Sequence, residues 1–584
     1  MSALLTRFSR RYALSLWGWY LFGILALAAT NLVTLEVPQL AKTIANALAD
    51  DPNLIQEHGD LQKVALWIMG LGITLMLIRS LSRILIFWPG RRIEAEVKQD
   101  LFRKLLRLPL AFYIKSGIGD LVSRISNDTT HLRIFFAFGI LQLLNLVFLT
   151  IFTVGRMLSV HPGLTAWTLA PLVTMLIITR VAMPRLHKYS RLSQDALGRL
   201  TTKVTESFVH THVIQANAAE DTFVARSEIE NDEVYRLNMK VVALRMVIFP
   251  LMTALSGVSQ LAVLIYGGRE VIQGRLSVGD ILAFNVYIGY LSFPLTAIGI
   301  ILSVYQRAIT ALERIQEVEE QPDETQLTLS TPKEENTSKE SPLLEIKNLT
   351  FRYGDSQQPM IDHFDLTLES GKKVGLYGPI GSGKSTLFNL VTRLQDPPQG
   401  TIYFQGRDIC TLSPRTLRAS IGYALQSVHL FSDSIENNLV FGITPRPSVA
   451  ATEQAAKDAQ IYDEILKFDH QWQAQIGEKG IRLSGGQKQR LALARLFLRQ
   501  PHLYILDDVT SALDQRTEQS VVDRIFRTKA AMLIASHRPG ALSSCDEILI
   551  LDQGKIVDRG SFADMVARRE DFRQAHLEQS GGHP

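Results

Sequence analysis

The first half of the chain is dominated by long apolar runs separated by polar segments. Five of these runs contain no Asp, Glu, Lys or Arg: residues 12–35, 134–155, 157–179, 246–268 and 281–306. Each is long enough, or nearly so, for the roughly 20 residues that cross a bilayer as a helix. The runs are continuous rather than alternating, and backbone groups in lipid must be satisfied internally, so they predict membrane-spanning helices.

A sixth apolar segment is interrupted by two positive charges, Arg79 and Arg83. Charge bias supports it as a span, because the N-terminus and the segments 91–133 and 180–245 are basic, whereas residues 50–60 are acidic and contain no Lys or Arg. Basic loops stay in the cytoplasm. The N-terminus is therefore predicted to be cytoplasmic, with six spans at about residues 12–36, 64–90, 134–158, 162–185, 244–268 and 280–306.

The two basic segments have few glycines or prolines and a helical pattern, for example over residues 94–108 and 189–208. They are predicted to extend the membrane helices into the cytoplasm. Their turns, at residues 116–120 and 211–217, are the candidate sites of coupling to a domain below the membrane.

A polar segment separates the apolar half from the rest of the chain. Residues 319–342 are charged, contain three prolines and lack aromatic residues, which is typical of a linker. The sequence thus predicts a membrane domain over residues 1–318 and a second domain over residues 343–584.

The overall composition fits this division. The 584 residues are 46% hydrophobic and only 20% charged, below the roughly 25% usual in soluble proteins. The net charge of +4 is too small to indicate a nucleic-acid partner. The two cysteines, Cys410 and Cys545, fit neither a disulfide scaffold nor a zinc site.

The second domain contains a glycine-rich phosphate-binding motif. Residues 373–377 have the pattern of a buried strand, residues 378–385 are GPIGSGKS, and a helical pattern follows. Strand, G-x-x-x-x-G-K-S and helix form a P-loop, whose backbone amides and helix N-terminus surround phosphates. Lys384 can reach the β- and γ-phosphates, and Ser385 can bind Mg²⁺. The predicted nucleotide contacts here are Gly378, Pro379, Ile380, Gly381, Ser382, Gly383, Lys384, Ser385 and Thr386.

A second apolar strand, at residues 501–506, ends in two acidic residues. A carboxylate at the end of a buried strand beside a P-loop holds the Mg²⁺ that accompanies the nucleotide. Asp507 is therefore predicted to be the metal-side carboxylate. Asp508 lies where a residue that activates the attacking water is expected.

A short motif between the P-loop and the second apolar strand resembles one particular family of ATPases. Residues 483–487 are LSGGQ, followed by an amphipathic helix, and this resembles the signature of ATP-binding-cassette (ABC) ATPases. Other elements of that pattern occur in order. Tyr353 resembles the aromatic residue that stacks on adenine, Gln426 the Q-loop glutamine that reaches the metal, and His537 the switch histidine. Residues 511–514 (SALD) resemble the D-loop.

Six membrane helices ahead of this cassette resemble a half-size ABC exporter over essentially the whole chain. The resemblance implies an all-α six-helix transmembrane domain followed by an α/β P-loop ABC nucleotide-binding domain, in the plasma (inner) membrane with the ATPase domain in the cytoplasm. ATP and Mg²⁺ would lie between the P-loop of one chain and the signature of its partner. The partner's nucleotide would be contacted by Ser484, Gly485, Gly486 and Gln487. Hydrolysis would then drive export of an amphipathic small molecule, lipid or peptide by alternating access.

One position departs from the family pattern, because active cassettes usually carry Glu where this chain has Asp508. Aspartate is one methylene shorter, and a misplacement of about 1 Å can cost on the order of 10²-fold in rate. The resemblance then favours a chain with an impaired site of its own, paired with a second half-exporter that carries the Glu. A homodimer with two slow sites, and an ABC-type membrane sensor with little transport, remain as alternatives.

Five arginines lie in or beside the predicted spans: Arg79, Arg83, Arg156, Arg180 and Arg245. Charges inside a membrane are costly unless they are paired or in contact with water. If several faced a central cavity, they would favour an amphipathic or anionic substrate. The alternative interpretation of each arginine is that its side chain snorkels to the membrane interface or forms hydrogen bonds between helices.

Overall fold

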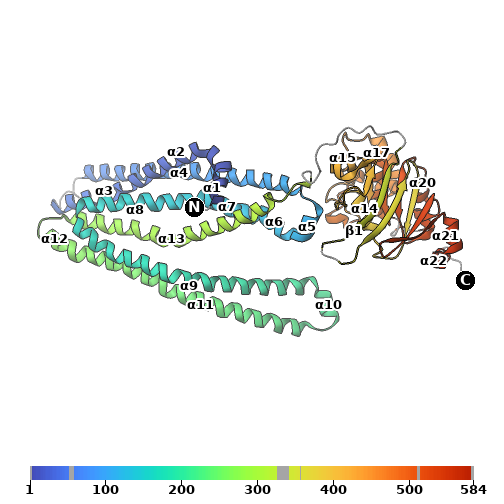
Figure 1. Cartoon of the computed structure of the whole chain (residues 1–584). Helices are drawn as coiled ribbons and strands as arrows, with labels where there is room; N and C mark the ends of the chain where they lie inside the picture. Colours follow the sequence, from blue (N-terminus) through green and yellow to red (C-terminus); the bar gives the residue numbers. More distant parts are fainter. Residues whose placement is uncertain are drawn as a thin grey trace. The chain divides into compact units, whose positions relative to one another are not determined.

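The computed structural model describes residues 3–50, 58–324, 341–354, 357–509, 513 and 515–579. Most of the acidic segment 50–60 and of the predicted linker lies outside these ranges. The chain divides into two compact units. The helical unit comprises Met1–Leu105 and Ile118–Glu320, and the sheet unit comprises Leu106–Gly117 and Gln321–Pro584 (Figure 1).

The helical unit is built from a few very long helices and several short ones (Figure 1). Two of them, α4 and α9, have 48 residues each, so each is about 72 Å long at 1.5 Å per residue and exceeds the bilayer core. The helices are α1 (Ala3–Phe8), α2 (Trp17–Thr34), α3 (Glu36–Asp50), α4 (His58–Leu105), α6 (Ile118–Ser123), α7 (Thr129–Ile134), α8 (Ile140–Val160), α9 (Pro162–Val209), α10 (Thr211–Ala216), α11 (Glu220–Ala262), α12 (Gly268–Ile272) and α13 (Val278–Glu319).

Within the described residues, five helical stretches are long and apolar enough to cross a membrane. They are Leu4–Asn46, Leu66–Leu105, Ile118–Val160, Pro162–Val209 and Glu220–Ile272. A shorter apolar helix, Val278–Ser292, occupies the start of α13, where the sixth span is predicted. The protein is thus helical and multi-pass, and the count of six spans stays a prediction.

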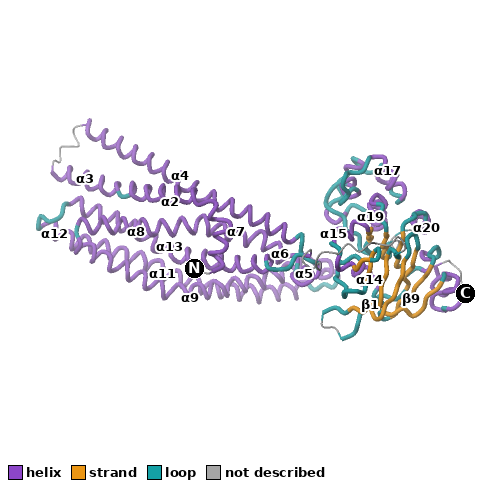
Figure 2. Tube along the Cα trace, turned by 45° about the horizontal axis from the view of Figure 1, so that its top comes forward, coloured by secondary structure: helices purple, strands orange, loops and turns teal. Residues whose placement is uncertain are grey.

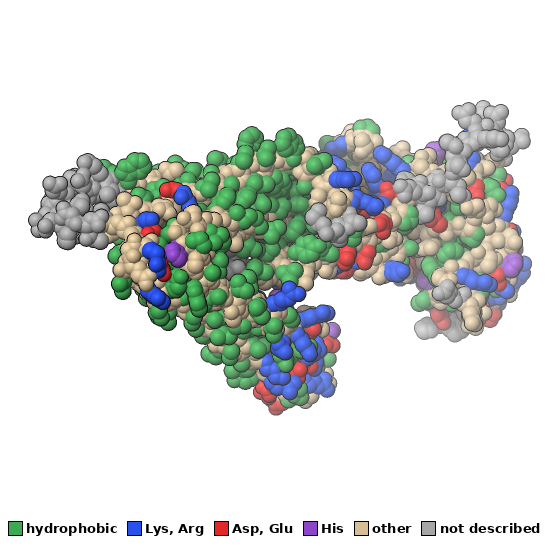
Figure 3. Space-filling model, turned by 60° about the vertical axis from the view of Figure 1, so that its left-hand side comes forward, with side chains coloured by type: hydrophobic (Ala, Val, Ile, Leu, Met, Phe, Trp, Pro, Cys, Tyr) green, Lys and Arg blue, Asp and Glu red, His purple; other side chains and the backbone are tan. Residues whose placement is uncertain are grey.

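The outward surface of the helical unit is apolar. Large side chains such as Trp67, Ile151 and Ile177 are 60% or more exposed, which is unfavourable in water over so large an area. Figure 3 shows hydrophobic side chains covering the long helices on the face in view, with Lys and Arg gathered toward helix ends. This distribution fits helices whose outer face contacts lipid.

Ion pairs join the polar ends of the helices in this unit. Arg314 of α13 bonds Asp120 and lies 2.9 Å from Asp128, and Arg124 bonds Asp120 and Glu317 at 2.7 and 2.9 Å. The two arginines hold the pKa of the Asp120 carboxyl below its ordinary value, chiefly through the hydrogen bond from Arg124. These contacts tie α13 to α6 and to the π-helical segment Arg124–Asp128 that follows it.

The sheet unit contains two sheets (Figure 2). A six-stranded sheet has the order β10-β9-β3-β8-β7-β6, with β10 antiparallel and the other strands parallel. A four-stranded antiparallel sheet has the order β2-β1-β4-β5. The strands are β1 (Leu344–Phe351), β2 (Ile361–Leu368), β3 (Lys373–Tyr377), β4 (Ile402–Phe404), β5 (Arg407–Asp408), β6 (Ile421–Ala424), β7 (Leu503–Asp507), β8 (Ala531–Ala535), β9 (Glu547–Asp552) and β10 (Lys555–Gly560).

Helices cover these sheets, and the stretch of sequence between β6 and β7 forms a separate group of helices, α16 to α19. The helices of the sheet unit are α5 (Leu110–Ser116), α14 (Lys384–Val391), α15 (Pro414–Ser420), α16 (Ile435–Leu439), α17 (Val449–Asp458), α18 (Tyr462–Ile465), α19 (Gly485–Arg499), α20 (Gln515–Phe526), α21 (Phe562–Arg568) and α22 (Glu570–Gln579). Strands β3, β7 and β8 are hydrophobic on both faces, as parallel strands covered on both sides must be.

The predicted strands around the P-loop and the second carboxylate are present with small shifts. The strand over 373–377 has the predicted bounds, whereas β7 runs over Leu503–Asp507 and includes the first acidic residue. The helix after the P-loop ends at Val391, because Arg393 adopts a left-handed φ of 50° that an α-helix cannot contain.

Residues 106–117 group with the sheet unit, although the sequence places them in the membrane half. Their attachment is visible in the backbone, since the carbonyl of Arg107 accepts a 2.8 Å hydrogen bond from the N–H of Glu324. The carboxylate of Glu324 in turn accepts from the guanidinium of Arg418 at 2.6 and 3.1 Å. The start of residues 106–117, which lead into the candidate coupling turn at 116–120, is therefore bonded to the start of the predicted linker.

Candidate nucleotide site

The P-loop follows β3, and its glycines are required by the backbone. A Cβ atom on Gly378 would lie 2.2 Å from the carbonyl oxygen of Leu551, so no side chain fits there. Gly383 has a φ of 103°, and a Cβ atom on it would lie 2.8 Å from the carbonyl oxygen of Met360. Gly383 is also the residue that caps α14, so the loop turns directly into a helix N-terminus, which is an anion-binding arrangement.

Lys384 brings a buried positive charge into this loop. Its side chain is 7% exposed, and its ammonium donates to the carbonyl oxygens of Gly378 and Pro379 at 2.7 and 2.9 Å and to Ser382 Oγ at 3.2 Å. Burial lowers the pKa of Lys384, while the nearby carboxylates of Asp507 and Asp508 act in the opposite direction. A buried cation held by its own loop is placed to meet an anionic ligand.

The remaining predicted contacts surround Lys384. Ser382, Gly383 and Thr386 are buried, whereas Pro379, Ile380, Gly381 and Ser385 are exposed at the mouth of the loop. The loop therefore exposes its turn at residues 379–381 together with Ser385, and keeps its cation inside.

Asp507 ends β7 as a buried carboxylate, 4% exposed. Burial raises its pKa, while a hydrogen bond from the Ser385 hydroxyl and the charges of Lys384 and His537 act in the opposite direction. A hydroxyl and a carboxylate in contact at the mouth of a phosphate-binding loop are the oxygen ligands that Mg²⁺ uses with nucleotides. The residues present therefore fit Mg²⁺, which would neutralise phosphate charge when bound.

The burial of Asp507 predicts a conflict between function and stability. A carboxyl with a raised native pKa stabilises the fold more as pH falls through that pKa, and destabilises it when charged at neutral pH. Asp507→Asn is therefore expected to raise the thermal midpoint of the nucleotide-free protein by a few degrees at pH 7.5 and to raise it less at pH 5. Differential scanning fluorimetry at both pH values measures this, and a lower midpoint at pH 7.5 would contradict it.

Strand register brings the other predicted residues to the same edge of the sheet. Asp507 of β7 is paired with Ala535 of β8, so His537 follows two residues beyond. Ala424, the last residue of β6, is paired with Leu506, so Gln426 and Asp508 both follow the carboxyl ends of these neighbouring strands. Ligands bind at the carboxyl ends of parallel strands, so the sheet assembles all four predicted groups at one edge.

Asp508 has a backbone φ of 48° and donates its N–H to the carbonyl of Ala535 at 2.9 Å. Aspartate and asparagine tolerate this left-handed region better than most residues. The local backbone thus suits the residue that the sequence has here.

Tyr353 lies beside the first turn of α14. Its hydroxyl donates to Thr386 Oγ1 at 3.2 Å, and its ring meets that of Phe351 edge-on at 5.1 Å. The ring is 42% exposed. An exposed aromatic ring anchored to the P-loop helix can stack on a base.

The signature residues form the exposed start of α19. Ser484 caps the helix: its Oγ accepts from the N–H of Gln487 at 3.3 Å, and Gln487 Oε1 accepts from the N–H of Ser484 at 2.9 Å. Gln487 also donates to Glu464 at 2.8 Å, so its side chain is engaged within the chain. Ser484 and Gly485 are exposed and Gly486 is half-buried. Residues 511, 512 and 514 of the predicted D-loop lie outside the described residues.

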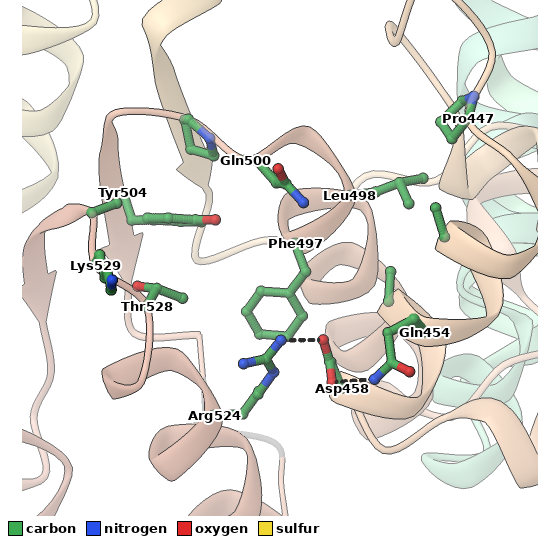
Figure 4. Close-up of a pocket in the computed structure, with 14 residues that line it drawn as sticks. Pro447, Gln454, Asp458, Phe497, Leu498, Gln500, Tyr504, Arg524, Thr528 and Lys529 are labelled. Atoms are coloured by element: carbon green, nitrogen blue, oxygen red, sulfur yellow. Dashed lines mark hydrogen bonds and ion pairs between the residues drawn. The ribbon is translucent and has the colours of Figure 1, made fainter.

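A different cavity in the sheet unit was not predicted from the sequence. It has a volume of about 420 Å³ and lies between α17, α19, β7 and α20 (Figure 4). Asp458 accepts from Arg524 at 2.7 Å and from Gln454 at 2.9 Å, below the ring of Phe497 in Figure 4. Among its described lining residues there is none of the predicted nucleotide contacts, so this cavity is separate from the P-loop.

Apolar helices followed by a P-loop domain with a separate signature helix define an ABC transporter. Family models agree: residues 20–295 match the ABC transporter transmembrane region and residues 361–511 match the ABC transporter model. The chain belongs to the ABC transporter family. It is an ABC exporter, a multi-pass inner-membrane protein whose cytoplasmic ATPase domain couples ATP hydrolysis to transport.

Individual relatives match over nearly the whole chain. It is 30% identical to "Probable multidrug resistance ABC transporter ATP-binding/permease protein YheI" of Bacillus subtilis, over 96% of this chain and 95% of that one. It is 28% identical to "ATP-dependent lipid A-core flippase" of Vibrio cholerae, over 95% and 94%. A bacterial Atm1-family ABC exporter with ATP bound has the same fold, with a TM-score of 0.78 at 23% identity, covering 98% and 99% of the two chains.

Proposed function

We propose that this chain is one half of a heterodimeric exporter that moves an amphipathic small molecule, lipid or peptide by alternating access. Its own P-loop site, completed by Asp507 and Asp508, binds ATP and Mg²⁺ but hydrolyses slowly. Its exposed signature at Ser484 completes the faster site of a different half-exporter. The observation that carries this proposal is Asp508 at the sheet edge beside an intact P-loop and an intact signature.

Each site residue has a proposed role. Lys384 binds the β- and γ-phosphates, Ser385, Asp507 and Gln426 hold the metal, and Tyr353 stacks on adenine. His537 and Asp508 orient the attacking water. The exposed helix N-terminus at Ser484 supports a role in trans, since it is an anion site that presents itself at the surface.

Transport itself distinguishes this proposal from a membrane sensor. Purified complex in liposomes is expected to move a fluorescently labelled phospholipid between leaflets in the presence of ATP and Mg²⁺. Chemical quenching of the fluorescence of the labelled lipid in the outer leaflet measures this movement. Complex that hydrolyses ATP but moves neither this lipid nor amphipathic dyes would favour the sensor. Mass spectrometry of the purified complex identifies its chains, and a single chain type would favour the homodimer.

The proposed topology predicts which engineered cysteines react from outside the cell. Arg269→Cys is expected to react with an impermeant maleimide in sealed cells, because Arg269 is exposed in the short helix α12 between the last two predicted spans. Lys98→Cys, in the cytoplasmic extension of α4, is expected to react only after permeabilisation. Labelling of Lys98→Cys in sealed cells would contradict the six-span arrangement.

The native cysteines give little background in this experiment. Cys410 and Cys545 are 5% and 8% exposed. Burial raises the pKa of the Cys410 thiol to about 11 and that of Cys545 to about 12. Both thiols stay protonated at neutral pH, and the thiolate is the reactive form.

A further inference from the structure

Four helices of the helical unit enclose a polar cavity. Helix α2 packs on α4 and α8, and α13 packs on α4 and α8, so the four helices run side by side (Figure 2). The cavity between them has a volume of about 300 Å³. It is lined by Leu27, Thr30, Asn31, Thr34, Arg79, Ser82, Arg83, Leu141, Gln142, Asn145, Leu149, Gly289 and Tyr290.

Two arginines give this cavity its charge. Arg79 and Arg83 are four residues apart on α4, so their guanidinium groups lie on one face of the helix and repel each other. Among the described residues that line the cavity there is no Asp or Glu to compensate them. Both lie inside the predicted span 64–90, where a charge is costly unless something pairs with it.

The other polar side chains of the cavity fall into two groups. Thr30, Thr34 and Ser82 donate to carbonyls of their own helices at 2.7 to 2.9 Å, and the Asn31 amide donates to Leu27 at 3.0 Å. By contrast, no hydrogen bond or ion pair within the described part of the chain engages the side chains of Arg79, Arg83, Gln142, Asn145 and Tyr290. The cavity therefore offers two guanidinium groups, two amides and a phenol as donors.

We propose that this cavity binds the anionic head group of an amphipathic ligand, with Arg79 and Arg83 as its cationic contacts. Planar guanidinium groups bind phosphate and carboxylate through paired hydrogen bonds, and Gln142, Asn145 and Tyr290 supply further donors. The apolar lining of Leu27, Leu141 and Leu149 and the lipid-facing helices around it accommodate a hydrocarbon tail.

This inference rests on the proposed function and names the substrate class of the exporter as amphipathic anions. Snorkelling accounts for an isolated arginine near a helix end. It does not account for Arg79 and Arg83, which lie within a span and line one cavity together with polar side chains of α2, α8 and α13. The same cavity disfavours cationic amphiphiles, because the two fixed positive charges repel them.

Photolabelling of the full-length protein tests the site without requiring transport. The complex in phosphatidylcholine nanodiscs is exposed to a diazirine-bearing dodecyl phosphate, and to the matching dodecyl trimethylammonium probe. The phosphate probe is expected to label peptides from α2, α4, α8 or α13 saturably, and the ammonium probe is not. Arg79→Gln/Arg83→Gln is expected to weaken this labelling about tenfold or more, since charge-assisted hydrogen bonds are lost.

Matched variants separate this site from general charge effects. Arg180→Gln removes an exposed arginine of α9 that does not line the cavity, and labelling should then change less than about twofold. Arg79→Lys/Arg83→Lys keeps both charges and is expected to be labelled by the phosphate probe more strongly than Arg79→Gln/Arg83→Gln. This second double variant keeps the test valid if the Gln variant fails to fold.

Three outcomes would overturn the inference. They are equal labelling by both probes, labelling unchanged in Arg79→Gln/Arg83→Gln, and full competition by inorganic phosphate, which would indicate a site for free anions rather than amphiphiles. Binding without ATP-driven movement of the phosphate probe would instead contradict the proposed export and leave the site intact. Transport without labelling of these helices would contradict the site alone.

Discussion

Lys384→Ala is expected to abolish tight ATP binding at the site formed by this chain. The side chain is the buried cation of the P-loop, and its ammonium donates to the carbonyl oxygens of Gly378 and Pro379 in that loop. Removing one partner of a buried charge pair costs about 2–5 kcal/mol, so affinity should fall roughly 30-fold to several thousandfold. Photo-crosslinking of azido-ATP, quantified on each chain after separation by mass, measures this directly.

A neighbouring lysine provides the control for that experiment. Lys372 precedes the same strand but is exposed, and lies 3.9 Å from Asp546 at the opposite end of β3. Lys372→Ala should leave crosslinking unchanged, because exposed ion pairs contribute about 0–1 kcal/mol. Crosslinking of the Lys384→Ala chain at the wild-type level would show that this P-loop is not the nucleotide site.

The strand, loop and helix of the P-loop could be predicted because local sequence determines them. Gly378, Gly383 and Lys384 act within one strand-loop-helix segment, and the motif specifies both the turn and the charge. Asp507 was also predictable, since four apolar residues before a carboxylate indicate a buried strand end. By contrast, the placement of Gln426 and Asp508 at one edge of the sheet depends on the pairing of β6 with β7. These strands are separated by 78 residues, and their pairing could not be derived from spacing.

The membrane half was predicted less completely. The helical patterns over residues 94–108 and 189–208 did predict that membrane helices continue beyond the apolar runs, and α4 and α9 continue to Leu105 and Val209. The grouping of residues 106–117 with the sheet unit depends on a tertiary contact with Glu324. Likewise, the sequence could place Arg79 and Arg83 in a span, but only the packing of α2, α8 and α13 shows that they line a cavity.

Asp508→Asn and Ser484→Arg are expected to differ sharply in a heterodimer. In that assembly Asp508 would serve only the slow site of this chain, so Asp508→Asn should lower ATP turnover of the complex by less than about twofold. Ser484 lies at the exposed helix N-terminus that would meet the partner's nucleotide, so Ser484→Arg should block the faster site and lower turnover by about 10²-fold. In a homodimer both sites use both residues, and the two substitutions should be comparably severe. Steady-state ATP hydrolysis by purified complex, with its chains identified by mass, distinguishes the cases.

Folding effects can be separated from effects on the chemistry in this comparison. Asp508→Asn should fold normally, because asparagine tolerates the φ of 48° as well as aspartate does. Ser484→Arg also removes a helix cap, which costs about 1 kcal/mol. Ser561 caps α21 in the same way, with Asp564 in place of Gln487, so Ser561→Arg loses an equivalent cap outside the signature and should keep near-normal turnover. A complex of one chain type in which Asp508→Asn is nearly inactive would contradict the heterodimer, because the residue would then serve every site.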